Sequence, residues 1–141
     1  PGRVQFIDKG KLLNYRGARP IWIDGAHNSH SATALAAALA KITGEKWTLI
    51  AGMLETRKPD DIFMPLKNVI SEIFTITIPG QVTSLSAQEL SESCQDLGIK
   101  ANPKSSLSEA LSATCESEFV VICGSLYLAG HALLLNNTLP E

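Results

Sequence analysis

Cysteine is scarce in this 141-residue sequence. Cys94, Cys115 and Cys123 are odd in number and contain no C-x-x-C pair, so the pattern predicts neither a disulfide framework nor a structural zinc site. We expect three small buried thiols in a reducing compartment, the cytoplasm. The chain also has no large excess of either positive or negative charge. The 12 basic and 14 acidic residues leave a formal charge of −2 and no basic field for binding nucleic acid.

Long apolar runs and targeting signals are also missing. Residues 119–135 form the most apolar stretch, but Gly124 and Gly130 interrupt it, and it is shorter than the ~20 residues of a membrane helix. Residues 1–5 contain no apolar core of a signal peptide. We therefore expect no membrane partner. Pro1 as first residue suggests a trimmed Met or a piece of a longer chain, and the length predicts one domain over residues 1–141.

Three common motifs for nucleotide binding and nucleophilic catalysis do not occur. The only Gly-Lys pair is Gly10-Lys11, which Leu12 follows, so the phosphate-binding pattern G-x-x-x-x-G-K-[ST] is absent. G-x-G-x-x-G and G-x-S-x-G are absent as well. The chain thus has no phosphate loop of its own, and no residue in it is predicted to be a catalytic nucleophile.

Apolar patterns that are present predict strands alternating with helices. The predicted strands are residues 4–7, 11–14, 21–23, 47–52, 73–78, 99–102 and 119–123, and the predicted helices are 31–42, one entered through 58–61, 86–97, 108–116 and 126–135. This alternation predicts an α/β fold, a mostly parallel sheet with helices on both faces. The first two strands are expected to form a hairpin at an antiparallel edge, and an Asp within 58–61 to cap the second helix.

Three predicted strands end in loops with polar or glycine residues. These loops are 24–28, 52–54 and 124–127. Because ligands of open α/β sheets bind outside the carboxyl ends of the strands, we expect the three loops to meet in one site.

The loop 24–28 reads D-G-A-H-N. The carboxylate of Asp24 could hold ribose hydroxyls or an ammonium group, and His27 could donate to a carboxylate. The simpler alternative is that Asp24 and Asn28 only cap the helix that follows. Asp24, His27 and His30 are spaced by three, but a zinc helix needs His at i and i+4 with a Glu between them. No metal ligands are therefore predicted.

Two further features have a functional and a structural interpretation. Gly124 and Ser125 could cradle an anion at a helix start, or Ser125 could simply cap that helix. Arg57 and Lys58 could meet a phosphate or a substrate carboxylate, or lie in a solvated loop.

Three segments together resemble a known family. They are Pro1-Gly2-Arg3, the D-G-A-H-N loop and G-S-L-Y-L-A-G at 124–130. In this order they resemble the C-terminal domain of folylpolyglutamate synthase / dihydrofolate synthase, of the Mur ligase superfamily. The resemblance implies a Rossmann-like domain of the Mur ligase C-terminal type. It also implies an ATP-dependent ligase that adds L-glutamate to a folate or dihydropteroate carboxylate through an acyl phosphate.

The resemblance also implies where the parts of that reaction lie. ATP and Mg²⁺ would be bound mainly by an N-terminal P-loop domain, which is absent from this chain, so the isolated domain is expected to be inactive. Residues that match family positions divide into ATP-binding, glutamate-binding and loop-supporting groups. The ATP-binding group is Arg3 and Asp24; the glutamate-binding group is His27, Ser125 and Tyr127; the supporting group is Gly25, Asn28 and Gly124.

The sequence departs from the family pattern in three places. Residues 56–60 read T-R-K-P-D where the family often has Asp-Lys-Asp, Ser29 replaces a common Pro, and His131 replaces a common acid. Other functions stay open: a stand-alone α/β module that binds a nucleotide or an amino acid, another Mur-type ligase domain, or an interaction domain whose caps are purely structural. Nothing in the sequence separates dihydrofolate synthesis from glutamate-chain extension.

Overall fold

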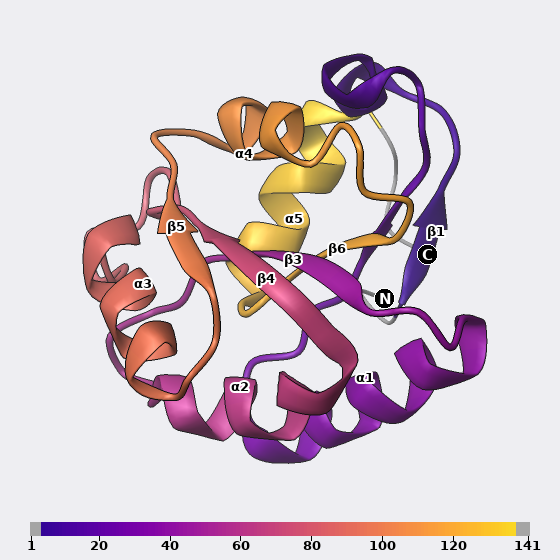
Figure 1. Cartoon of the computed structure of the whole chain (residues 1–141). Helices are drawn as coiled ribbons and strands as arrows, with labels where there is room; N and C mark the ends of the chain where they lie inside the picture. Colours follow the sequence, from indigo (N-terminus) through magenta and orange to yellow (C-terminus); the bar gives the residue numbers. More distant parts are fainter. Residues whose placement is uncertain (1–3, 138–141) are drawn as a thin grey trace.

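A six-stranded sheet organises the computed structural model, which describes residues 4–137. The strands are β1 Gln5–Ile7, β2 Ile21–Ile23, β3 Trp47–Ala51, β4 Ile70–Thr75, β5 Ala101–Pro103 and β6 Val120–Cys123. Their order is β1-β2-β6-β3-β4-β5, with β1 antiparallel to β2 and all other neighbours parallel (Figure 1). The mostly parallel α/β sheet expected from the sequence is confirmed.

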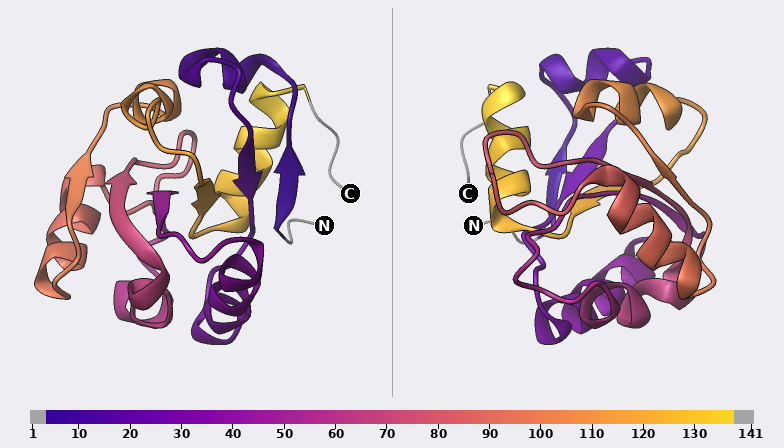
Figure 2. Two further views of the ribbon diagram at one scale, coloured as in Figure 1. Left: turned by 45° about the vertical axis from the view of Figure 1, so that its right-hand side comes forward. Right: turned by 90° about the vertical axis from the view of Figure 1, so that its left-hand side faces the viewer.

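Helices cover both faces of this sheet (Figure 2). They are α1 Ser29–Ile42, α2 Pro59–Leu66, α3 Ala87–Asp96, α4 Leu107–Ala113 and α5 Leu126–Leu135, with the short 3-10 helices η1 Lys11–Arg16 and η2 Lys67–Val69. One core layer packs α1, α2 and α3 on the sheet, and the other packs α4, α5 and η1. Every residue of β3 and β6 is therefore buried, as is typical of parallel strands covered on both sides. No helix within residues 4–137 is both long and apolar enough to cross a membrane.

The predicted strand at residues 11–14 is wrong, because this segment is the helix η1. Leu12 and Leu13 are both buried in the same core layer. Consecutive residues of a strand point to opposite faces, so only a helical turn can bury both on one side. Gly10 and Gly17, with φ of 128° and 64°, bracket that turn. The antiparallel edge does exist, but β1 pairs with β2.

Two smaller expectations also need correction. No aspartate side chain caps α2: its N-cap is Lys58, which makes no capping hydrogen bond, and Pro59 occupies the first helical position. The strand expected at 73–78 runs from Ile70 to Thr75. Ile76 and Ile78 lie beyond the end of the strand and are buried in the core layer under α5. Their burial explains why the apolar pattern typical of a strand continues to residue 78.

Arg16 is a buried cation that the sequence analysis did not single out. Its side chain is fully buried, and its guanidinium donates to carbonyl oxygens of Thr114 at 2.8 Å, Ser117 at 3.0 Å and Pro20 at 3.1 Å. Burial lowers the pKa of Arg16, because desolvation disfavours the charged form. Arg16 thus ties η1 to the end of α4 and to the segment that enters β6.

The cysteines do not all behave as expected. Cys94 and Cys123 are buried, but Cys115 is exposed. Burial raises the pKa of Cys94 to about 12 and raises the pKa of Cys123 further, with the Asp24 charge adding to the shift. Both buried thiols are therefore neutral, inert parts of the core.

Candidate functional site

The three predicted loops meet at one edge of the sheet, where β2, β6 and β3 end side by side. The Asp24 N–H donates to the Ile122 carbonyl at 2.9 Å, and the Gly124 N–H donates to the Ala26 carbonyl at 3.0 Å. These bonds join the loop after β2 to the loop after β6. Gly124 also lies against Gly52, which follows β3. The expectation that the three loops lie together at one edge of the sheet is confirmed.

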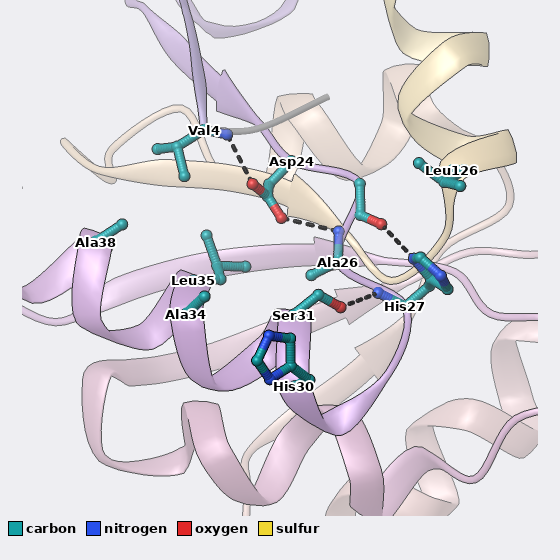
Figure 3. Close-up of a pocket in the computed structure, with 11 residues that line it drawn as sticks. Val4, Asp24, Ala26, His27, His30, Ser31, Ala34, Leu35, Ala38 and Leu126 are labelled. Carbon is teal, nitrogen blue, oxygen red and sulfur yellow. Dashed lines mark hydrogen bonds between the residues drawn. The ribbon is translucent and has the colours of Figure 1, made fainter. Parts of the chain in front are cut away.

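The carboxylate of Asp24 accepts hydrogen bonds from two backbone N–H groups beside the site (Figure 3). Its Oδ1 accepts from the Val4 N–H at 2.6 Å and its Oδ2 accepts from the Ala26 N–H at 2.8 Å. The side chain does not cap α1, so that part of the simpler interpretation is wrong. Asp24 lies 7% exposed beside a cavity and joins the start of β1 to the site. Arg3, the other predicted ATP-binding residue, lies outside the described residues.

Asn28 does cap α1, as the structural interpretation predicted. Its Oδ1 accepts from the Ser31 N–H at 2.8 Å, and Ser31 Oγ accepts from the Asn28 N–H at 3.1 Å, which completes a capping box. Ser31 Oγ also accepts from the His27 N–H at 3.0 Å. The cap therefore holds His27 as well as the helix, and α1 begins at Ser29, two residues earlier than expected.

His27 projects from this loop between two cavities. Its Nδ1 lies 2.9 Å from the carbonyl oxygen of Gly25 (Figure 3). That contact orients the ring through the backbone of Gly25.

Ser125 is the N-cap of α5, and its side chain also lines a cavity. Its Oγ accepts from the Tyr127 N–H at 3.0 Å, which caps α5. The same side chain, 3% exposed, lines a cavity. Because Oγ accepts from the helix, its own hydrogen is available to donate. Tyr127 is 55% exposed at the rim of this cavity.

Two cavities lie at this edge. The larger, about 350 Å³, runs along α1 and is lined by Val4, Asp24, Gly25, Ala26, His27, His30, Ser31, Ala34, Leu35, Ala38 and Leu126. The smaller, about 140 Å³, is lined by His27, Leu54, Arg57, Gly124, Ser125, Leu126 and Tyr127. His27 and Leu126 line both cavities, so the two cavities adjoin.

Arg57 is the residue that the sequence analysis left undecided. It lines the smaller cavity together with His27 and Ser125, whereas Lys58 does not. The departure from the family pattern at residues 56–60 therefore leaves a cation at the site. Which of these two neighbouring cations lines the cavity depends on how the loop after β3 packs against α5. No local pattern in the sequence distinguishes them.

Metal ligands do not gather at this site. Within residues 4–137, no group of three or more His, Cys, Asp or Glu side chains is placed to hold an ion. The chemistry that the arrangement offers is hydrogen bonding and charge: donors from Ser125 and Arg57, and an imidazole from His27.

Comparison with known families decides what kind of domain carries this site. A family model described as the C-terminal domain of dihydrofolate synthetase matches residues 12–135. The chain belongs to this family. The match includes the D-G-A-H-N loop, Arg57 and the Gly124–Tyr127 segment.

Individual relatives agree with the family. The folylpolyglutamate synthase of Lacticaseibacillus casei is 31% identical over 132 residues, which cover 92% of this chain. The chain spans 28% of the length of that relative.

Solved structures share the fold. A bifunctional folylpolyglutamate synthase/dihydrofolate synthase with Mn, AMPPNP and L-glutamate bound is 25% identical, with a TM-score of 0.75 over 95% of this chain and 31% of that one. The folylpolyglutamate synthase of Mycobacterium tuberculosis complexed with ADP gives a TM-score of 0.81 at 22% identity, over 100% of this chain and 33% of that one. The Rossmann-like α/β fold that the resemblance implied is therefore confirmed.

Proposed function

We propose that this chain is the C-terminal part of an ATP-dependent ligase that joins L-glutamate to the carboxylate of a folate or of dihydropteroate. ATP would phosphorylate that carboxylate, and the glutamate amine would then displace phosphate from the acyl phosphate. The observation that carries the proposal is the smaller cavity, where His27, Arg57 and Ser125 meet in a chain of this family. The relative with AMPPNP and L-glutamate bound supports the choice of ligands.

The smaller cavity is the proposed glutamate site. Ser125 offers a hydroxyl hydrogen, α5 begins there with its free backbone N–H groups, and Arg57 supplies a positive charge. These groups suit a carboxylate, and no residue between 4 and 137 that lines the cavity is acidic. His27 and Tyr127 complete the site in this proposal, while Gly25, Asn28 and Gly124 shape its loops.

The ATP side is proposed for the larger cavity, next to Asp24. The Asp24 carboxylate anchors the backbone there through the N–H groups of Val4 and Ala26. Arg3 is the other residue that the proposal assigns to the nucleotide phosphates. Since His27 lines both cavities, the glutamate would lie next to the nucleotide site.

The remaining machinery would lie outside this chain. The sequence contains no phosphate loop, so the proposal assigns most of the binding of ATP and Mg²⁺ to an N-terminal P-loop domain in a longer cytoplasmic protein. Closure of that domain on the carboxyl edge of the sheet would exclude water from the acyl phosphate. The 141-residue chain alone would then be inactive.

The test is glutamate-dependent release of ADP by the full-length product of the reading frame that contains this chain. We expect activity with MgATP and a dihydropteroate or folate acceptor, and none from residues 1–141 alone. Ser125→Ala should raise the KM for glutamate about tenfold, the cost of one hydrogen bond to a charged group. Ser86→Ala, which removes the N-cap of α3 at a residue that does not line this cavity, is the matched control.

Two results would contradict the proposal. Glutamate-dependent ADP release by residues 1–141 alone would remove the need for a P-loop domain. Tight binding of glutamate or a nucleotide by this chain, together with an inactive full-length protein, would favour a stand-alone binding module.

A further inference from the structure

The position of one proton on His27 follows from the structure. His27 Nδ1 lies 2.9 Å from the Gly25 carbonyl oxygen. A carbonyl oxygen can only accept, so Nδ1 must carry the hydrogen of this bond. In a neutral imidazole the other nitrogen, Nε2, then has a lone pair and no hydrogen. None of the hydrogen bonds identified among residues 4–137 uses Nε2.

In this tautomer Nε2 is a hydrogen-bond acceptor, whereas Ser125 and Arg57 offer donors to the same cavity. Ser125 Oγ already accepts from the Tyr127 N–H, which leaves its hydroxyl hydrogen to donate, and Arg57 has only donors. A carboxylate that reaches these two donors would meet the Nε2 lone pair of a neutral His27. Only the imidazolium, with hydrogens on both nitrogens, could donate to that carboxylate while keeping its bond to Gly25.

The charges around His27 decide when it would take up the second proton. Arg57, on the loop after β3, shares the smaller cavity, and its positive charge opposes an imidazolium while the cavity is empty. Asp24 on its own loop favours the imidazolium, but both carboxylate oxygens accept from backbone N–H groups. His30 on α1 lines the larger cavity, and Tyr127 on α5 lines the smaller one. A bound carboxylate would offset the charge of Arg57 and favour protonation of His27.

We infer that this cavity binds glutamate together with one proton, which His27 takes up at Nε2 from the solvent. The inference rests on the proposed function of the cavity. It makes His27 a donor to a glutamate carboxylate only in its charged form. No covalent bond changes in this step: a carboxylate and a proton enter the cavity together.

The inference predicts the pH dependence of glutamate capture. If only the imidazolium binds a carboxylate, the KM for glutamate rises as the pH is raised and His27 loses its second proton, by at most about tenfold per pH unit.

The direct test is calorimetry of the full-length protein at pH 7.5, in buffers of small and large ionisation enthalpy. L-glutamate is one ligand. Glutarate, which has the two carboxylates and no amine, is the second, because it excludes protons exchanged by the glutamate amine. We expect both ligands to bind with uptake of a proton, at most one per site and the same amount for glutamate as for glutarate.

Two variants separate the role of His27 from mere support of the loop. His27→Gln provides a neutral donor, so it should bind glutarate without proton uptake and make the KM for glutamate independent of pH. Ser125→Ala should weaken binding but keep the uptake.

Two outcomes would overturn the inference: binding to the wild type with no proton uptake, or the same uptake by His27→Gln. In either case normal glutamate-dependent ADP release would leave the proposed function standing. Absence of both glutamate binding and ADP release would instead overturn the proposed function, and this inference with it.

Discussion

Gly124 packs directly against Gly52. A Cβ atom on Gly124 would lie 2.5 Å from the Gly52 carbonyl oxygen, and a Cβ on Gly52 would lie 2.9 Å from Cγ1 of Ile78. The two glycines follow β6 and β3, and their missing side chains let the two loops approach each other. This contact places Ser125 on the same cavity as Arg57.

Gly124→Ala should destabilise the chain by about 3 kcal/mol or more. The new methyl group meets backbone, which cannot move aside easily, and Gly124 has a φ of 113° that residues with a Cβ rarely adopt. Urea unfolding of the 141-residue chain measures the effect. Gly44→Ala is the control, because no atom lies within 4 Å of the added Cβ. Equal stability of the two variants would contradict the packing described here.

Arg57→Met should raise the KM for glutamate in the full-length protein about tenfold or more, because a charged donor is lost from the cavity. The KM for ATP should change little. Lys58→Met is the matched control: it removes an adjacent positive charge that does not line the cavity, and we expect a change below about twofold. Equal effects of both variants on the KM for glutamate would show that Arg57 acts only through its long-range charge, not through direct contact with glutamate.

Asn28→Ala and Ser86→Ala each remove the N-cap of a capping box, so each should cost about 1 kcal/mol of unfolding free energy. Their effects on the site should differ. Ser31, the partner of Asn28, also accepts from the His27 N–H, whereas Ser86 caps α3. We therefore expect Asn28→Ala alone to weaken glutamate binding by the full-length protein. Calorimetry measures this binding. Unchanged glutamate binding by Asn28→Ala would show that the cap does not hold the site in place.

The chain should lose stability in alkali through its buried thiols. Burial raises the pKa of Cys94 to about 12, whereas an unfolded thiol ionises near pH 8.5. Above that pH the unfolded state loses a proton that the folded state keeps, so this thiol should reduce the unfolding free energy by about 1.4 kcal/mol per pH unit until its folded pKa is reached.

Cys94→Ala should therefore make the fall in stability between pH 8 and pH 10 less steep, as measured by urea unfolding. It should not abolish the fall, because burial also raises the pKa of Cys123. Cys115→Ala, at an exposed position, is the control. An unchanged slope in Cys94→Ala would contradict this account.

Arg16→Lys should cost about 3 kcal/mol, because the single ammonium group of a lysine cannot donate to the separate carbonyls of Thr114, Ser117 and Pro20 at once, so charged hydrogen bonds are lost. Arg19→Lys, at an exposed position, should stay within about 0.5 kcal/mol of the wild type. Thermal or urea unfolding of the two variants compares them directly.

Much of the local structure was predictable. The helix Leu126–Leu135 has the expected bounds, and the capping box of Ser86 and Glu89 forms as its S-x-x-E pattern predicts. The strand predicted at residues 11–14 failed because four mixed residues do not distinguish a strand from a helical turn. There the tertiary structure decided the outcome, because one core layer buries both Leu12 and Leu13.

The sequence by itself determined the alternation of strands and helices, the caps and the family motifs, because these depend on residues a few positions apart. Only the tertiary structure placed β6 between β2 and β3, which brings the loops of His27, Arg57 and Ser125 onto neighbouring cavities. It also decided that Asp24 holds Val4, a partner 20 residues away, and that Arg16 caps the end of α4. Such contacts depend on the order of strands in the sheet, which no local pattern of side chains records.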